Sequence, residues 1–169
     1  MTRYAAFLRA VNVGGTGKLP MAELRVMCEG LGLVKVQTYI ASGNVVFESS
    51  MSATKAKAAL QASVAKYLGK SAGIFIRDYA ALEAVIAANP FPQAEGNRLM
   101  VILLNDVPTR MMIDAAKFQT DEQIALGKAC FYVHYPSGMG QSKLKIPGAE
   151  QGTARNMNTM RKMLELLNG

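Results

Sequence analysis

Strand-like and helix-like segments alternate in the order βαββαβ before the first strong break in the chain. The break is Asn89-Pro90-Phe91-Pro92, because proline has no backbone N–H and two prolines end a helix. The expected strands are Tyr4 to Val11, Val34 to Tyr39, Asn44 to Glu48 and Gly73 to Arg77, with helices from about Pro20, Ser52 and Asp78. This order is typical of the ferredoxin-like arrangement, an antiparallel sheet with helices on one face.

The segments after the break partly repeat this pattern. We expect strands at Leu99 to Leu104, Gln123 to Leu126 and Cys130 to Tyr135, a short helix from about Thr109, and a final helix from about Thr153 to Leu167. The sequence therefore predicts an α+β fold in which a ferredoxin-like first half (βαββαβ) is fused to a second, truncated ferredoxin-like half. We expect one domain, residues 1–169, with subhalves of about 1–88 and 89–169.

Two of the predicted strands are central in their sheets. The runs from Tyr4 to Val11 and from Leu99 to Leu104 are apolar on nearly every residue, which is typical of strands covered on both faces.

Composition excludes several classes of protein. Half of the residues are hydrophobic and 18% are charged, so the chain is not disordered. No apolar run approaches the ~20 residues that a membrane-spanning helix needs, and the first residues lack a secretion signal. Cys28 and Cys130 are far apart in apolar segments, which predicts buried free thiols and, with the other features, a cytoplasmic protein. The net charge of +7 favours anionic partners.

A glycine-rich loop from Asn12 to Lys18 lies between a predicted strand and a predicted helix. It lacks the spacing of a phosphate-binding P-loop, because Asn12 stands where that motif has glycine and Leu19 where it has Ser or Thr. The dinucleotide-binding pattern also fails, because its third glycine would fall at Pro20. The glycines still leave backbone N–H groups open to the close approach of a ligand.

Polar residues near the end of the chain form a second group. Arg155 and Asn156 are expected in the first turn of the last helix, where unbonded N–H groups and a guanidinium suit a carboxylate or phosphate. The apolar stripe of that helix predicts that Arg155 and Thr159 face away from the core. A polar, glycine-containing loop that ends in Ser142 and Lys143 precedes it.

The leading hypothesis is a binding protein for a small anionic or phosphorylated ligand. The expected ligand-binding residues are Arg9, Asn12, Gly14, Gly15, Lys18, Ser42, Asn44, Ser142, Lys143, Arg155, Asn156 and Thr159. This hypothesis requires the glycine-rich loop and the last helix to share one site.

Three alternatives stay open. The first is an enzyme with Ser42 or Ser142 as nucleophile and Lys143 or His134 as base, although a structural role for His134 is favoured. The second is a nucleic-acid-binding module, weakened because Asn44-Val45-Val46-Phe47 lacks the basic residue and paired aromatics that stack bases. The third is an interaction protein that uses a sheet edge. One histidine and two separated cysteines predict no zinc site, and the sequence assigns no cofactor and no oligomeric state.

Short motifs along the whole chain resemble one bacterial family of uncharacterised proteins, domain of unknown function 1697 (DUF1697). The motifs are Leu8 to Gly15, Pro20-Met21, Thr38 to Phe47, Asn89-Pro90-Phe91, Tyr135-Pro136 with Gly138 and Gly140, Ser142-Lys143-Leu144 and Thr153 to Thr159. Ala10 stands where the family commonly has Gly, and Met157 where it often has Trp. The resemblance implies an α+β fold related to the ferredoxin-like arrangement, and no particular reaction.

Overall fold

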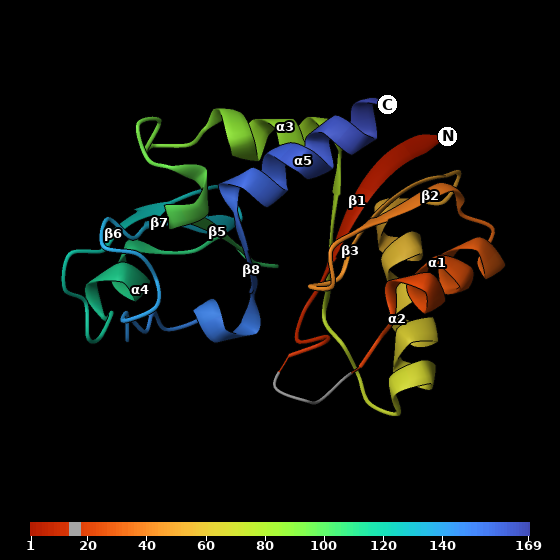
Figure 1. Ribbon diagram of the computed structural model, residues 1–169, viewed down its shortest axis with the longest axis horizontal. Coiled ribbons are helices and arrows are strands. Elements are labelled where there is room, and N and C mark those ends of the chain that lie inside the picture. The colour runs from red at the N-terminus through yellow and green to blue at the C-terminus, as the bar shows by residue number, and fades with distance from the viewer. Residues whose placement is uncertain (14–17) are drawn as a thin grey trace. The chain divides into compact units, whose positions relative to one another are not determined.

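The computed structural model describes residues 1–13 and 18–169. The chain forms two compact units (Figure 1). Unit 1 consists of Met1–Glu83 and Lys162–Gly169, and unit 2 of Ala84–Arg161. Each unit contains one four-stranded sheet in which all pairs are antiparallel.

Unit 1 has the βαββαβ order that the sequence predicts. Its elements are β1 (Thr2–Leu8), α1 (Met21–Gly30), β2 (Val34–Tyr39), β3 (Asn44–Ser49), α2 (Ala53–Leu68) and β4 (Ile74–Asp78), followed by α3 (Tyr79–Ala87), which enters unit 2. The strands are ordered β2-β3-β1-β4, so β1 is central and pairs with both β3 and β4. This is the strand order of the ferredoxin-like arrangement, and the predicted fold class is confirmed.

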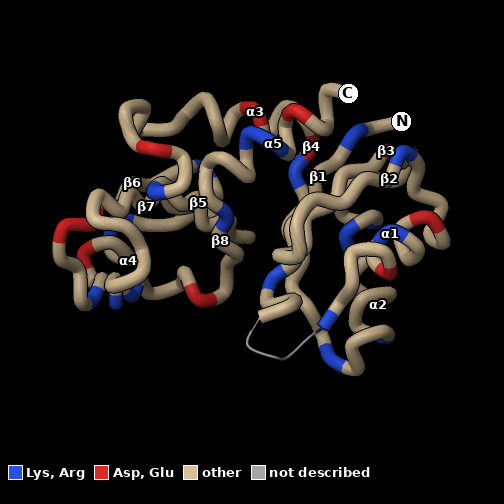
Figure 2. The backbone as a smooth tube through the Cα atoms, viewed as in Figure 1, with Lys and Arg blue, Asp and Glu red and all other residues tan. Residues whose placement is uncertain are grey.

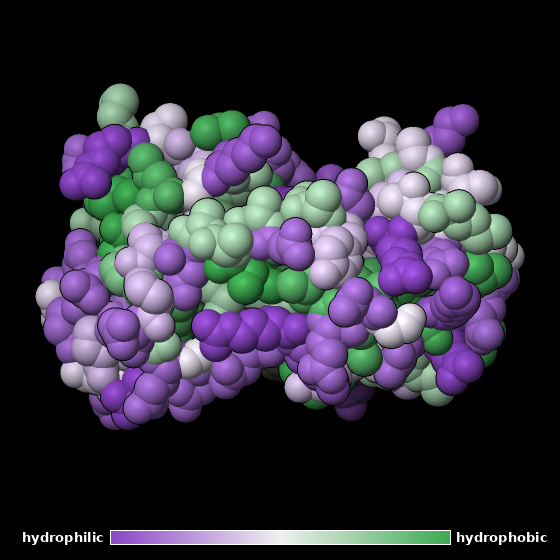
Figure 3. All heavy atoms as spheres, turned by 90° about the horizontal axis from the view of Figure 1, so that it is seen from above, coloured by the Kyte–Doolittle hydropathy of each residue, from purple (hydrophilic) through white to green (hydrophobic). Residues whose placement is uncertain are grey.

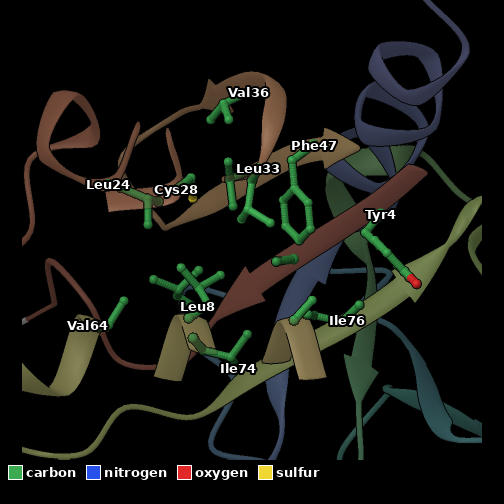
Figure 4. Close-up of a cluster of buried hydrophobic side chains, with 14 of the residues drawn as sticks. Tyr4, Leu8, Leu24, Cys28, Leu33, Val36, Phe47, Val64, Ile74 and Ile76 are labelled. Carbon is green, nitrogen blue, oxygen red and sulfur yellow. The ribbon is translucent and has the colours of Figure 1, made fainter. Parts of the chain in front are cut away.

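The helices α1 and α2 lie on one face of this sheet and enclose its core (Figures 1 and 4). Side chains of β1, β3 and β4, among them Leu8, Phe47 and Ile74, meet Leu24 of α1 and Leu60 of α2 in one buried cluster. Each such side chain contributes about 1.5–3 kcal/mol relative to an exposed position.

The opposite face of each central strand is also buried. In β1, Ala5 and Phe7 point away from the cluster that contains Leu8 and are fully buried. The central strand of unit 2 shows the same double burial, since Val101 and Ile102, on opposite faces, are both buried. The prediction that both strands are covered on two sides is confirmed.

Unit 2 repeats the strand order of unit 1 with one helix fewer. Its elements are η1 (Gly96–Arg98), β5 (Leu99–Leu103), α4 (Arg110–Asp114), β6 (Gln123–Leu126), β7 (Cys130–His134), η2 (Ala149–Gln151) and β8 (Thr153–Asn156); α5 (Met157–Asn168) starts in unit 2 and ends in unit 1. The strands are ordered β6-β7-β5-β8. Between β7 and β8, where unit 1 has α2, unit 2 has an irregular connection, residues 135–152, and its Ile146 packs on Phe131 and Ile102.

Two predicted boundaries are wrong. The last helix does not begin near Thr153, because residues 153–156 form β8, in which Arg155 pairs with Val101 of β5. The first strand ends at Leu8 and not at Val11, because Ala10 and Asn12 have left-handed φ angles of 60° and 57° that a strand does not allow.

Hydrophilic side chains cover much of the face seen in Figure 3, with hydrophobic ones between them. Across residues 1–13 and 18–169, none of the helices combines the length and hydropathy that crossing a membrane requires.

Replacing Gly43 with alanine tests the close packing between the β2–β3 turn and β1. Gly43 has φ 92°, and an added Cβ would lie 2.6 Å from Val11 Cγ2 and 3.0 Å from Leu8 Cβ. Gly69 at the end of α2 has φ 73° with no atom within 4 Å of such a Cβ. We expect Gly43→Ala to lower the free energy of unfolding by about 2–4 kcal/mol and Gly69→Ala by about 1 kcal/mol, measured by urea denaturation. Equal losses would contradict this packing.

Candidate functional site

Three connections meet at one end of the unit 1 sheet. They are the described residues 9–13 and 18–20 between β1 and α1, residues 40–43 between β2 and β3, and residues 69–73 between α2 and β4. The Leu8 N–H donates to Gly43 O and the Arg9 N–H donates to Gly73 O, both at 2.8 Å, so the end of β1 is bonded to the other two connections. We call this region the loop end of unit 1.

Asn12 ties the β1–α1 connection together at its base. Its Nδ2 donates to Leu19 O at 2.8 Å and to Ala41 O at 2.7 Å, and its Oδ1 accepts from the Leu19 N–H at 2.8 Å. These bonds join Asn12 to Leu19 and attach Asn12 to the β2–β3 turn. The Asn12 amide therefore has a structural role at the loop end. From the sequence alone this role cannot be distinguished from ligand binding.

Ser42 and Asn44 shape the β2–β3 turn. Asn44 is fully buried, and its Nδ2 donates to Tyr39 O at 3.0 Å and to Ser42 Oγ at 2.9 Å. These bonds hold the turn closed around Gly43. Of the predicted residues in unit 1, Arg9, Asn12, Lys18 and Ser42 belong to the loop end, Asn44 is the first residue of β3 next to it, and Gly14 and Gly15 lie outside the described residues.

The charged residues of the loop end are all cationic. Its three connections contain Arg9, Lys18 and Lys70 and no Asp or Glu. All three cationic residues are exposed, and Arg9 extends over Gly73, where an added Cβ would lie 3.3 Å from Arg9 Cβ. Figure 2 shows Lys and Arg, in blue, on the connections at this end. The local potential is therefore positive.

The predicted residues near the chain end have structural partners within unit 2. Arg155 is 7% exposed, and its Nη1 donates to Thr153 Oγ1 at 2.7 Å and to Ala154 O at 3.0 Å. Burial lowers the pKa of Arg155 to about 10, which still leaves the guanidinium charged near neutral pH. Asn156 Oδ1 accepts from the Thr159 N–H at 2.9 Å and so caps α5.

The expectation that Arg155 and Thr159 face away from the core is wrong. Both side chains are buried, at 7% exposure each. Arg155 lies in a strand, whose side chains alternate between faces, so the helical periodicity applied to it does not hold. Thr159 lies in the first turn of α5, close to the buried Met157 and Met160.

Ser142 fastens the irregular connection of unit 2 to a buried carboxylate. Its Oγ donates to Glu122 Oε2 at 2.5 Å, while Glu122 Oε1 accepts from the N–H and Oγ1 of Thr120 at 2.6 and 2.9 Å. The hydrogen bond from Ser142 is the largest of several that lower the pKa of Glu122 to about 2. A carboxylate with this pKa is too weak a base to remove the Ser142 proton near neutral pH, so the pair does not support Ser142 as a nucleophile. The neighbouring Lys143 is exposed.

His134 is held by a hydrogen bond, as the favoured structural interpretation expects. Its Nδ1 lies 2.8 Å from Oε1 of Gln123, its cross-strand partner, and its ring lies 5.7 Å from the Phe91 ring. His134 and Phe91 also line a groove that the predicted site does not include. The sequence signal for this groove is an aromatic residue between two prolines, a segment that we interpret from the sequence as a helix stop and a family motif and not as a site.

The cysteines and acids do not form a metal centre in the described part of the chain, where no group of three His, Cys, Asp or Glu side chains could hold an ion. Cys28 and Cys130 are buried free thiols, as predicted. Burial, with a smaller contribution from Glu29, raises the pKa of Cys28 to about 12, which is typical of an unreactive thiol.

The fold is that of an α+β protein with two ferredoxin-like units. Their sheets have the same strand order, and the second unit lacks the helix that corresponds to α2. The chain belongs to the family described as "Protein of unknown function (DUF1697)", whose model matches residues 1–132. Its structure is similar to that of the conserved bacterial protein SP0830 from Streptococcus pneumoniae, with a TM-score of 0.82, 28% sequence identity and 98% of both chains covered. No curated protein matches the chain.

Glu122→Gln tests whether the buried carboxylate holds the connection in place. Because the pKa of Glu122 is lowered from 4.5 to about 2 in the folded protein, its ionised form contributes stability above pH 4.5 that is lost as the pH falls toward 2. We expect Glu122→Gln to lower the free energy of unfolding at pH 7 by about 1–3 kcal/mol and to flatten its dependence between these pH values. Chemical denaturation across this range measures both effects. The exposed Glu83 provides the control variant Glu83→Gln, and an equal change in the two variants would refute the role of Glu122.

Proposed function

We propose that the loop end of unit 1 binds a small anionic or phosphorylated ligand. The observation that carries the proposal is the convergence of three connections that contain Arg9, Lys18 and Lys70 and no acidic residue. A ligand with two or more negative charges fits best, because a single exposed ion pair stabilises a complex by at most about 1 kcal/mol.

The hydrogen bonds of the loop end support this function by limiting the entropy lost on binding. Asn12 joins the β1–α1 connection to the β2–β3 turn, Asn44 closes that turn, and the Arg9 N–H bonds Gly73 O of the third connection, so these described parts of the backbone are held in place before a ligand arrives. Preorganisation of this kind raises affinity because fewer torsions are fixed during association. In this proposal Asn12, Ser42 and Asn44 support the site, and the cationic side chains contact the ligand.

The polar residues of unit 2 are not needed for the proposed site. Ser142, Arg155 and Asn156 each make hydrogen bonds that stabilise unit 2 itself. A single site that joins them to the loop end remains a prediction.

Nucleic-acid binding through the sheet has less support than anion binding. RNA-recognition sheets stack bases on exposed aromatic side chains. Phe7 on β1 and Phe47 on β3 are only 0% and 1% exposed.

Pyrophosphate titrations compare cationic residues inside and outside the loop end. At low ionic strength we expect Arg9→Ala and Lys18→Ala each to weaken binding about 5-fold, because each removes a contact worth about 1 kcal/mol. Lys55→Ala is the matched control, since Lys55 is exposed in the first turn of α2, at the other end of that helix from Gly69. We expect it to change the dissociation constant by less than about 2-fold, as only a distant charge is lost.

Isothermal titration calorimetry gives the dissociation constants. Equal weakening by all three variants would show that only net charge attracts the anion. Unchanged affinity in Arg9→Ala and Lys18→Ala, or no heat of binding with the unmodified protein, would reject the proposed site.

A further inference from the structure

Unit 2 contains an open groove of about 450 Å³, within the usual range of small-molecule sites. Its walls include Pro90, Phe91 and Pro92 from the segment after α3, Arg98 from η1, and the cross-strand pair Gln123 and His134. None of these residues belongs to the loop end of unit 1. We propose that this groove is a binding site for an aromatic carboxylate of one or two rings.

Hydrogen bonds along its walls hold the groove in shape before a ligand binds. The Phe91 N–H donates to Asn89 Oδ1 at 2.8 Å, and the Ala94 N–H donates to Phe91 O at 3.0 Å, which closes a turn between the prolines and η1. On the other wall, the Tyr135 N–H donates to Arg98 O at 2.8 Å. Proline rings fix φ in addition, so the segment loses little further freedom when a ligand binds.

Flat side chains provide the surface for an aromatic ring. The rings of Phe91 and His134 are 5.7 Å apart with an angle of 37° between their planes, and both are half-buried. Gln123 Oε1, 2.8 Å from His134 Nδ1, fixes the imidazole plane. Aromatic rings stack or meet edge to face at such separations, and each pair contributes about 0.5–1.5 kcal/mol beyond its buried area.

Arg98 provides the charge that favours a carboxylate on this ring. Its Nη1 donates to Pro136 O at 2.5 Å, which positions the guanidinium at the groove, and its Nε lies 3.8 Å from Glu95 Oε2. A guanidinium has five N–H donors, so these two contacts leave donors for a planar carboxylate. Glu95 repels an anion from one side, which favours a single carboxylate over a phosphate that carries two charges.

The absence of tryptophan from the sequence allows a direct binding assay. Indole-3-acetate is the probe, because its fluorescence anisotropy can be followed by excitation beyond the tyrosine absorption band. Indole lacks the carboxylate, and cyclohexylacetate keeps the carboxylate without the aromatic ring. We expect indole-3-acetate to bind, and each analogue to bind or compete at least about 5-fold more weakly.

Two variants and two matched controls locate the binding. Phe91→Leu keeps an apolar side chain but removes the ring, and we expect it to weaken indole-3-acetate binding about 3- to 10-fold. Arg98→Gln removes the charge, and we expect a loss of about 10-fold. The controls are Phe118→Leu, an exposed phenylalanine of the same unit, and Arg110→Gln, an arginine that also pairs with a nearby acid; both should leave binding unchanged. Thermal melts establish that each variant is folded.

Several outcomes would overturn the proposal. They are the absence of indole-3-acetate binding, equal binding of cyclohexylacetate, unchanged affinity in folded Phe91→Leu, and equal losses in the control variants. Binding of a proline-rich peptide in place of indole-3-acetate would also overturn it. The pyrophosphate titrations depend on different residues, so either proposal can fail alone.

Discussion

Antiparallel pairing of β1 with both β3 and β4 is the constraint on which unit 1 depends. It places an apolar strand at the centre of the sheet, where Leu8 packs under the helices and Phe7 is buried on the other face. The same pairing brings the end of β1, the start of β3 and the start of β4 to one end of the sheet. Three connections that lie between residue 9 and residue 73 of the sequence therefore meet at the loop end.

Unit 2 covers a sheet of the same strand order with less regular structure. Its sheet has the same order, but the place of the second helix is taken by residues 135–152, which bury Ile146 against the strands. An irregular segment satisfies fewer of its backbone groups internally than a helix does, so some of them need hydrogen bonds to their surroundings. The backbone pair of Lys117 with Lys145 provides such bonds, and the side-chain hydrogen bond from Ser142 to Glu122 holds the segment at a second point.

The sequence predicts those helices and strands that are determined by residue patterns within the segment itself. Periodicity, together with Pro20, Ser52 and Asp78 at helix starts, indicates the βαββαβ order and the truncated second half, and the structure confirms both. It fails at Arg155, because β8 is a strand only through its pairing with β5, about 54 residues away. The sequence also does not show which polar residues hold the loops in place and which would contact a ligand. The amide of Asn12 bonds Ala41, 29 residues away, and only the structure shows this contact.

The central claim is that the folded sheet gathers cationic residues into one anion site at the loop end. Backbone amide NMR spectra recorded during a pyrophosphate titration test this claim most directly, because they report on the individual backbone amides of both units in one experiment. The account predicts that the largest shift changes fall on residues 9–13, 18–19, 40–43 and 70–73, and saturate together. Changes spread evenly over the lysines of α2, or concentrated in unit 2, would contradict it.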